Sequence, residues 1–183
     1  MCIVSSTSQI DQREPATKKS HLRILCLGND LLGDDSLGSV VAAQLREFAP
    51  ADVEVVYTPE TGFDLLDYLL NVSRVVVVDT VLAGSAPPGT IFQIRDSDLE
   101  SFPGASPHYV GLFEALAVAR FLRLHAAEDV LILAVEMSDC YTVGADMQPA
   151  VAAAIPVLIS MLREKMDERT RAVPAPSAEQ AIR

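Results

Sequence analysis

Short apolar runs alternate with segments of helical periodicity between residues 22 and 166. Runs rich in Val, Ile and Leu are typical of buried strands, and apolar residues three and four positions apart are typical of amphipathic helices. The pattern predicts strands at residues 22–27, 53–57, 75–78, 90–94 and 130–135. It predicts helices at residues 37–48, 63–70, 109–124 and 147–166, with a kink in the last one at Pro156.

This order of elements predicts an α/β fold with three layers (αβα), in which helices cover both faces of a mostly parallel, twisted sheet. The four consecutive valines at 75–78 are typical of a central parallel strand. We expect a single domain at residues 21–166, between a flexible arm at 1–20 and a flexible tail at 167–183. Sites in such sheets form beyond the carboxyl ends of the strands, so we expect the chemistry in the loops that follow them.

Charge and cysteine content narrow the class of protein. The chain of 183 residues has 14 Lys and Arg against 25 Asp and Glu, which gives a net charge of −11. Such a surface repels phosphate, so we expect neither nucleic acid nor an anionic membrane as the partner. Three cysteines without a CxxC motif favour a reducing compartment, and no apolar run predicts a membrane span or a secretory signal. We therefore expect a cytoplasmic protein.

Loops after the predicted strands hold residues that suit catalysis or metal binding. The loop at 28–38 lacks the GxGxxG fingerprint and carries Asp34 and Asp35 where a dinucleotide phosphate would lie, which argues against a nucleotide cofactor. Asp79 follows the four valines, where a carboxylate is costly to bury unless it is used or paired. His108 comes directly before the helix predicted at 109–124.

Asp35, Asp79 and His108 would form a set of two carboxylates and one imidazole if they met at one edge of the sheet. Such a set suits a borderline divalent ion such as nickel or zinc. It is too sparse for a closed structural zinc site, and it suits a metal that another molecule carries. The alternative is structural: the helix dipole stabilises aspartates at its N-terminus, Asp79 caps a turn, and a lone histidine is satisfied within the fold.

Two further residues lie on the rim of the same predicted edge. Glu136 ends the last strand, and we expect it to bind substrate or to cap the loop at 137–145. Gly62, in the loop after the strand at 53–57, leaves the backbone open to close approach by a peptide. No G-x-S-x-G elbow is present, and Cys26 lies within a strand as a small buried residue, so neither a serine nor a cysteine nucleophile is favoured.

Taken together, these motifs resemble the hydrogenase maturation endopeptidases, which process the large subunit of nickel-iron hydrogenases. The likeness spans about residues 22–165 and is carried by Gly28-Asn29-x-Leu31-x-x-Asp34-Asp35-x-x-Gly38, by the strand that ends in Asp79, and by Ser106-Pro107-His108 followed by Gly111-Leu112. The resemblance implies a five-stranded sheet with one antiparallel edge strand, at 90–94. It also implies an enzyme that removes a C-terminal extension from the precursor large subunit after nickel is inserted.

The resemblance places the family's metal-contacting positions at Asp35, Asp79 and His108. The nickel would belong to the substrate, so we expect no tightly bound cofactor of the protein's own. The precursor large subunit would be a transient partner, and Asn29, Asp34, Gly62 and Glu136 are the positions where we expect contact with it.

The sequence departs from the family pattern at two positions near the proposed site. Cys26 stands where the family usually has glycine, and Asp35 stands where many relatives have glutamate, which is longer by one methylene. Two alternatives to the processing endopeptidase are a catalytically idle docking module of the same fold and a peptidase of that fold with another substrate.

Overall fold

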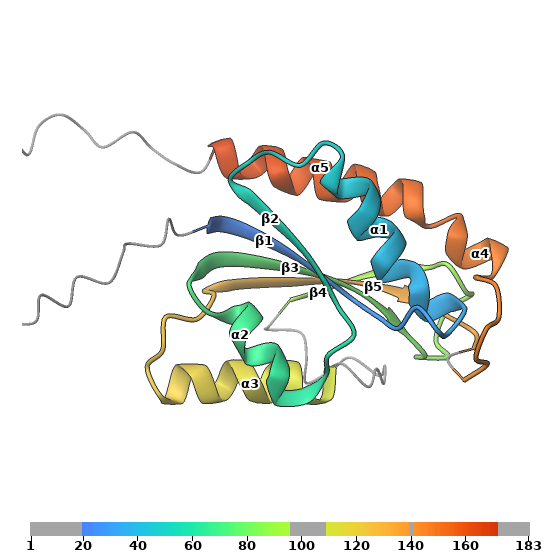
Figure 1. Cartoon of the computed structure of the whole chain (residues 1–183), viewed down its shortest axis with the longest axis horizontal. Coiled ribbons are helices and arrows are strands. Elements are labelled where there is room, and N and C mark those ends of the chain that lie inside the picture. Colours follow the sequence, from blue (N-terminus) through green and yellow to red (C-terminus); the bar gives the residue numbers. More distant parts are fainter. Residues whose placement is uncertain (1–19, 96–108, 140, 172–183) are drawn as a thin grey trace, which may run out of the picture.

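The structure is a computed structural model, and it describes residues 20–95, 109–139 and 141–171. One sheet of five strands forms the middle layer, in the order β2-β1-β3-β5-β4 (Figure 1). β1, β2, β3 and β5 are parallel to one another, and β4 pairs with β5 in the antiparallel direction. The predicted α/β class and the antiparallel edge strand are confirmed. The strands are β1 (Ser20–Leu27), β2 (Val53–Thr58), β3 (Val72–Val81), β4 (Ile91–Arg95) and β5 (Asp129–Glu136).

Helices cover both faces of this sheet, as the alternating pattern predicts. α1 and α5 lie on one face, and α2 and α3 lie on the other (Figure 1). In the part of the chain that the structure describes, no helix is long and apolar enough to cross a membrane. The helical segments are η1 (Asp34–Ser36), α1 (Leu37–Arg46), η2 (Gly62–Leu65), α2 (Leu66–Leu69), α3 (Tyr109–Phe121), α4 (Pro149–Ala152) and α5 (Ile155–Arg171).

The structure has two helices where the sequence predicts one at 147–166. The predicted kink at Pro156 is wrong, because the chain breaks before this proline. The chain leaves α-helical geometry at residues 153–154, and Pro156 is the second residue of α5. A proline in the first turn costs little, because the N–H that it lacks has no partner within the helix. α5 then continues to Arg171, into the region predicted as the start of the flexible tail.

Alternation of side chains along the strands produces one apolar core on each face of the sheet. In β3, Val76 and Val78 pack in the core that α1 and α5 share, whereas Val75, Val77 and Val81 pack in the core that α3 shares. The valine-rich strand is buried on both faces, as expected for a central strand of a parallel sheet.

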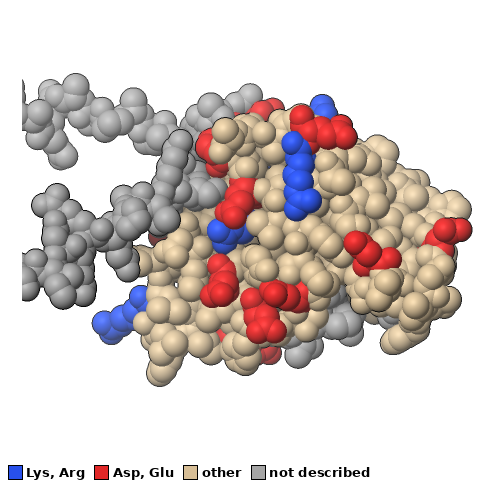
Figure 2. Space-filling model, in the orientation of Figure 1, with Lys and Arg blue, Asp and Glu red and all other residues tan. Residues whose placement is uncertain are grey.

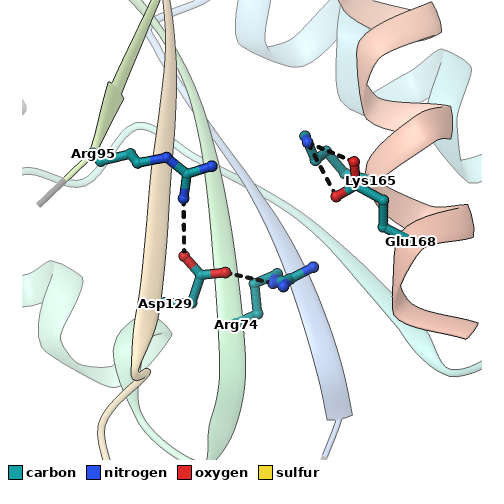
Figure 3. A network of polar contacts seen from close by, with 5 residues as sticks. All are labelled: Arg74, Arg95, Asp129, Lys165 and Glu168. Carbon is teal, nitrogen blue, oxygen red and sulfur yellow. Dashed lines mark hydrogen bonds and ion pairs between the residues drawn. The ribbon is translucent and has the colours of Figure 1, made fainter. Parts of the chain in front are cut away.

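Ion pairs join three neighbouring strands at the amino end of β5. Asp129 lies 2.7 Å from Arg74 of β3 and 3.8 Å from Arg95 of β4, measured between oxygen and nitrogen (Figure 3). A separate pair joins Lys165 and Glu168 on α5. These pairs are partly exposed, so each contributes at most about 1 kcal/mol.

Candidate functional site

The loop between β1 and α1 is pressed against the carboxyl end of β1. Gly28 has φ +145°, and a Cβ at this position would lie 2.1 Å from the backbone oxygen of Asp35. The same oxygen accepts a hydrogen bond from the N–H of Asn29 at 3.2 Å. A Cβ on Gly38 would lie 2.0 Å from the backbone oxygen of Leu27. The two glycines therefore permit the close approach that sets Asp35 at the edge of the sheet.

Thr80 connects the carboxylates of Asp35 and Asp79. Its hydroxyl donates a hydrogen bond to Asp35 Oδ1 at 2.6 Å, and its backbone N–H donates to Asp79 Oδ1 at 2.8 Å. The exposed fractions are 7% for Asp35, 0% for Asp79 and 1% for Thr80. The structure thus brings two of the predicted site residues within one hydrogen bond of the same residue, near the end of β3.

The two carboxylates approach Thr80 from opposite sides of the sheet. Alternate residues of a strand point to opposite faces. Val78 packs with α1 and α5, so Thr80 points to that side, where η1 holds Asp35. Val77 and Val81 pack with α3, so Asp79 points to the side where α3 begins at Tyr109.

His108 lies outside the described residues, directly before Tyr109. Within the described residues, no three His, Cys, Asp or Glu side chains come together in a group able to hold a metal ion. Asp35 and Asp79 supply two oxygen donors, which suit a borderline divalent ion only when a nitrogen donor joins them. The predicted set therefore depends on His108 and stays a prediction.

Asp34 holds the loop between β5 and α4. Its Oδ1 accepts a hydrogen bond from the N–H of Gln148 at 2.8 Å, and its Oδ2 accepts one from the N–H of Ser138 at 3.3 Å. The side chain is 2% exposed. A buried carboxylate that receives a backbone N–H from each end of residues 138–148 fixes both ends of that loop.

Glu136 has a different role from the predicted cap of loop 137–145. Its Oε1 accepts hydrogen bonds from the N–H groups of Ala83 and Gly84, at 3.0 and 2.8 Å, so it caps the turn after β3. Glu136 Oε2 is buried and has no hydrogen-bond partner among the residues that the structure describes. The side chain lies at the same edge of the sheet as Asp79, because Val81 of β3 pairs with Glu136 of β5.

Asn29 and Gly62 both lie in loops at the carboxyl ends of strands. The side chain of Asn29 accepts a hydrogen bond from the N–H of Leu31 at 3.0 Å and so shapes its own turn. Gly62 has φ +65°, and among the described residues no atom beyond its chain neighbours lies within 4 Å of the position that a Cβ would occupy. Contact of either residue with a substrate stays a prediction.

Tyr57 and Thr80 were not identified from the sequence. The Tyr57 hydroxyl donates a hydrogen bond to the backbone oxygen of Gly28 at 3.3 Å, and burial together with a hydrogen bond to Asp30 raises the pKa of Tyr57 to about 12. Both residues lie near the carboxyl end of a strand: Tyr57 contacts Gly28, and Thr80 follows Asp79 in the chain. Once the order of strands is known, that position is the signal that identifies them.

Acidic residues line a hollow beside α2, and exposed apolar residues lie in the loops that follow β1 and β5. A hollow of about 270 Å³ beside α2 is lined by Glu60, Asp64, Asp67, Phe63, Leu66 and Tyr68, and acidic side chains gather over this part of the surface (Figure 2). Leu31, Tyr141 and Val143 are 66%, 79% and 72% exposed. Their loops pair with one another, since the N–H of Gly144 donates to the Leu31 oxygen at 2.8 Å. We call these three residues the apolar rim.

Comparison with a known protein family gives a match over most of the domain. The family described as hydrogenase maturation protease matches residues 39–165. This stretch includes Asp79, His108 and Glu136, whereas Asp34 and Asp35 lie before it.

Curated proteins and solved structures give matches of the same kind. The chain is 31% identical over 153 residues to the hydrogenase expression/formation protein HupD of Rhodobacter capsulatus, which covers 80% of this chain and 71% of that protein. It is 29% identical over 160 residues to the hydrogenase 2 maturation protease of Escherichia coli, which covers 84% and 96%. The structure of the hydrogenase maturating endopeptidase HybD from E. coli has a TM-score of 0.71 at 23% identity, covering 81% and 93%, which supports the fold.

Proposed function

Because the chain belongs to the hydrogenase maturation proteases and is therefore an endopeptidase of hydrogenase processing, we propose that it removes a C-terminal extension from a precursor large subunit. The substrate of this reaction is the precursor of a nickel-iron hydrogenase after nickel insertion. Asp35, Asp79 and His108 recognise the nickel that the precursor carries. The metal belongs to the substrate and leaves with it.

The observation that best supports this proposal is the connection of Asp35 and Asp79 through Thr80. Two carboxylates from different elements are held at the carboxyl edge of the sheet, which is where ligands bind in open α/β folds. Carboxylate oxygens are donors that a borderline divalent ion accepts together with a nitrogen donor. A substrate that brings such an ion would meet the oxygens of Asp35 and Asp79, and His108 would add the nitrogen donor.

In the proposed reaction, the nickel of the precursor would polarise the scissile carbonyl, and the edge carboxylates would position a water molecule for attack. The water adds its hydroxyl to the carbonyl carbon, the C–N bond breaks, and the remaining proton passes to the leaving amine. The products are the shortened large subunit with a new carboxyl terminus and the released peptide. Recognition of the metal makes cleavage conditional on nickel insertion.

The apolar rim supports the proposal that the substrate is a folded protein. Leu31, Tyr141 and Val143 expose large apolar side chains on two loops, one of which also carries Asp35. Exposed apolar surface beside a site is typical of a surface that another protein covers. We propose that the folded part of the precursor covers the rim transiently while its C-terminal segment lies at the carboxylates.

The buried, free Cys26 is in keeping with a reducing compartment, and we propose that the reaction takes place in the cytoplasm.

Intact-mass spectrometry of a precursor large subunit with and without this protein tests the proposed function. The nickel-loaded precursor is expected to lose a C-terminal peptide, and the metal-free precursor, as the control, is expected to stay at full length. Cleavage of both forms would contradict nickel recognition. Co-elution of the two proteins without cleavage would favour the docking module.

A further inference from the structure

Thr80 is the residue through which the two carboxylates are held relative to one another. Its hydroxyl bonds to Asp35 on the α1 side of the sheet, and its N–H bonds to Asp79, the residue before it. Thr80 pairs with Val135 of β5, whereas the pairing of β3 with β1 ends at Val78, so strand pairing holds the backbone of Thr80 from the β5 side. The hydroxyl therefore presents a fixed donor to Asp35.

Asp35 lies in the short 3-10 helix η1, which follows a loop. Its backbone therefore has fewer hydrogen bonds to neighbouring elements than the backbone of a residue within a strand. The backbone oxygen of Asp35 accepts the N–H of Asn29 at 3.2 Å, which holds the turn against the loop after β1. The direction of the carboxylate is set by the contacts of the side chain itself, and the hydrogen bond from Thr80 at 2.6 Å restricts it. Hydrogen bonds to a metal-binding carboxylate from a neighbouring residue orient the ligand, and their loss typically weakens metal binding or activity about 10–100-fold.

We propose that Thr80 is a positioning residue for nickel recognition: it orients the Asp35 carboxylate and fixes it relative to Asp79. This inference deepens the proposed function and depends on it. Thr80 does not contact the metal, and it acts through Asp35.

Thr80→Val tests this role, because valine has nearly the shape of threonine and lacks the hydroxyl. Thr80→Ser keeps the hydroxyl and is the rescue variant. Thr58→Val is the matched control: Thr58 is also a buried threonine near the carboxyl end of a strand, and its hydroxyl oxygen accepts hydrogen bonds from Glu60 N–H and Tyr68. Thr80→Ala replaces Thr80→Val if the valine variant does not fold.

The readout is the ratio of dissociation constants for metal-free and nickel-loaded precursor, measured by biolayer interferometry with the precursor immobilised. General damage to the fold weakens binding of both forms alike, whereas a misplaced Asp35 weakens only the nickel-dependent part. We expect Thr80→Val to lower the ratio about 10–100-fold. Thr80→Ser and Thr58→Val are expected to keep it near the wild-type value. Adding Thr80→Val to Asp35→Asn is expected to change nothing further.

The outcomes separate this inference from the proposed function. If the wild type binds the nickel-loaded precursor more tightly and Thr80→Val keeps that preference in full, Thr80 has no positioning role. A further loss on adding Thr80→Val to Asp35→Asn would also overturn the inference, because Thr80 would then act independently of Asp35. If the wild type shows no preference for nickel, nickel recognition itself is wrong, and the role of Thr80 falls with it.

Discussion

Asp34 and Asp35 are adjacent in the chain, yet their carboxylates bond to different parts of the fold. Asp34 receives backbone N–H groups from Ser138 and Gln148, and Asp35 receives the hydroxyl of Thr80. Asp34 stabilises the loop at 138–148, which carries Tyr141 and Val143 of the apolar rim. Asp35 shares Thr80 with Asp79 as a hydrogen-bond partner. The pair thus separates a structural role from the proposed catalytic one, and each role can be tested by itself.

Asp34→Asn is expected to destabilise the fold, because an amide offers one acceptor oxygen where the carboxylate uses two. The amide nitrogen would then face a backbone N–H in a buried place. We expect the free energy of unfolding to fall by about 1–3 kcal/mol, measured by chemical denaturation. Asp64→Asn, at an exposed aspartate of η2, is the control and should change it by less than about 0.5 kcal/mol. Equal stability of the two variants would contradict the role of Asp34.

Gly38→Ala is expected to destabilise the fold although Gly38 lies inside a helix. Alanine would normally stabilise an α-helix by about 1 kcal/mol relative to glycine. The new Cβ would lie 2.0 Å from the Leu27 oxygen, however, so α1 must move away from β1. We expect a loss of about 3 kcal/mol or more, because the clash outweighs the helix propensity.

Gly84→Ala is the matched control for this prediction. Gly84 has φ +65°, and no atom of the described residues, its chain neighbours aside, lies within 4 Å of its would-be Cβ, so the backbone conformation is what opposes the substitution. A loss of about 1–2 kcal/mol is expected there. If Gly38→Ala were the milder of the two in thermal or chemical unfolding, the close contact between α1 and β1 would be wrong.

Cys26 is expected to resist thiol reagents in the native protein. Burial raises its pKa to about 12, against an opposing effect of the Arg46 charge. Because folding raises the pKa of this thiol from its ordinary value of 9.0, the thiol leaves stability unchanged below pH 9 and lowers it as pH rises from 9 towards 12. A Cys2→Ser/Cys140→Ser variant should react with a disulfide reagent at pH 8 far more slowly when folded than when unfolded. Equal rates would show that Cys26 is accessible.

Polar substitution in the apolar rim is expected to weaken binding of the precursor and to leave the fold stable. Leu31→Ser and Val143→Ser each remove a large exposed side chain, so KM should rise about 10-fold, or ~1.4 kcal/mol, with little change in kcat. Phe121→Ser is the control, because Phe121 is 85% exposed at the end of α3, towards the amino ends of the strands. A rise in KM for Phe121→Ser as large as that for Leu31→Ser would place the interface elsewhere.

The hydrophobic pattern predicted the sheet and most of its helices, because the residues that these elements bury are apolar and recur at strand or helix spacing. The four valines of β3 are buried on both faces, and this pattern alone indicates a central parallel strand. The antiparallel direction of β4 was predicted from the resemblance alone, because a short apolar run is compatible with either strand direction. The division between α4 and α5 was missed because apolar periodicity continues across the break.

Individual side-chain roles were harder to predict than positions. The carboxyl ends of strands identified Asp79 and Glu136, but the groups that Glu136 caps come from the turn after β3, which only the folded chain brings near. Thr80 was missed because its significance depends on alternation within β3 and on the place of η1. Asp34 and Asp35 are adjacent and carry the same charge, so the residues alone do not separate their roles, and the resemblance indicates metal contact for Asp35 without indicating that Asp34 binds the loop at 138–148.

The central claim is tested most directly by the processing of nickel-loaded precursor by Asp35→Asn and Asp79→Asn. Each asparagine keeps an oxygen that can accept the hydrogen bond from Thr80, so both variants are expected to fold, as circular dichroism would verify. Intact-mass spectrometry should show the wild type shortening the precursor, while both variants leave it at full length. Removal of the C-terminal peptide by either variant at the wild-type rate would contradict the assignment of these two carboxylates to the reaction.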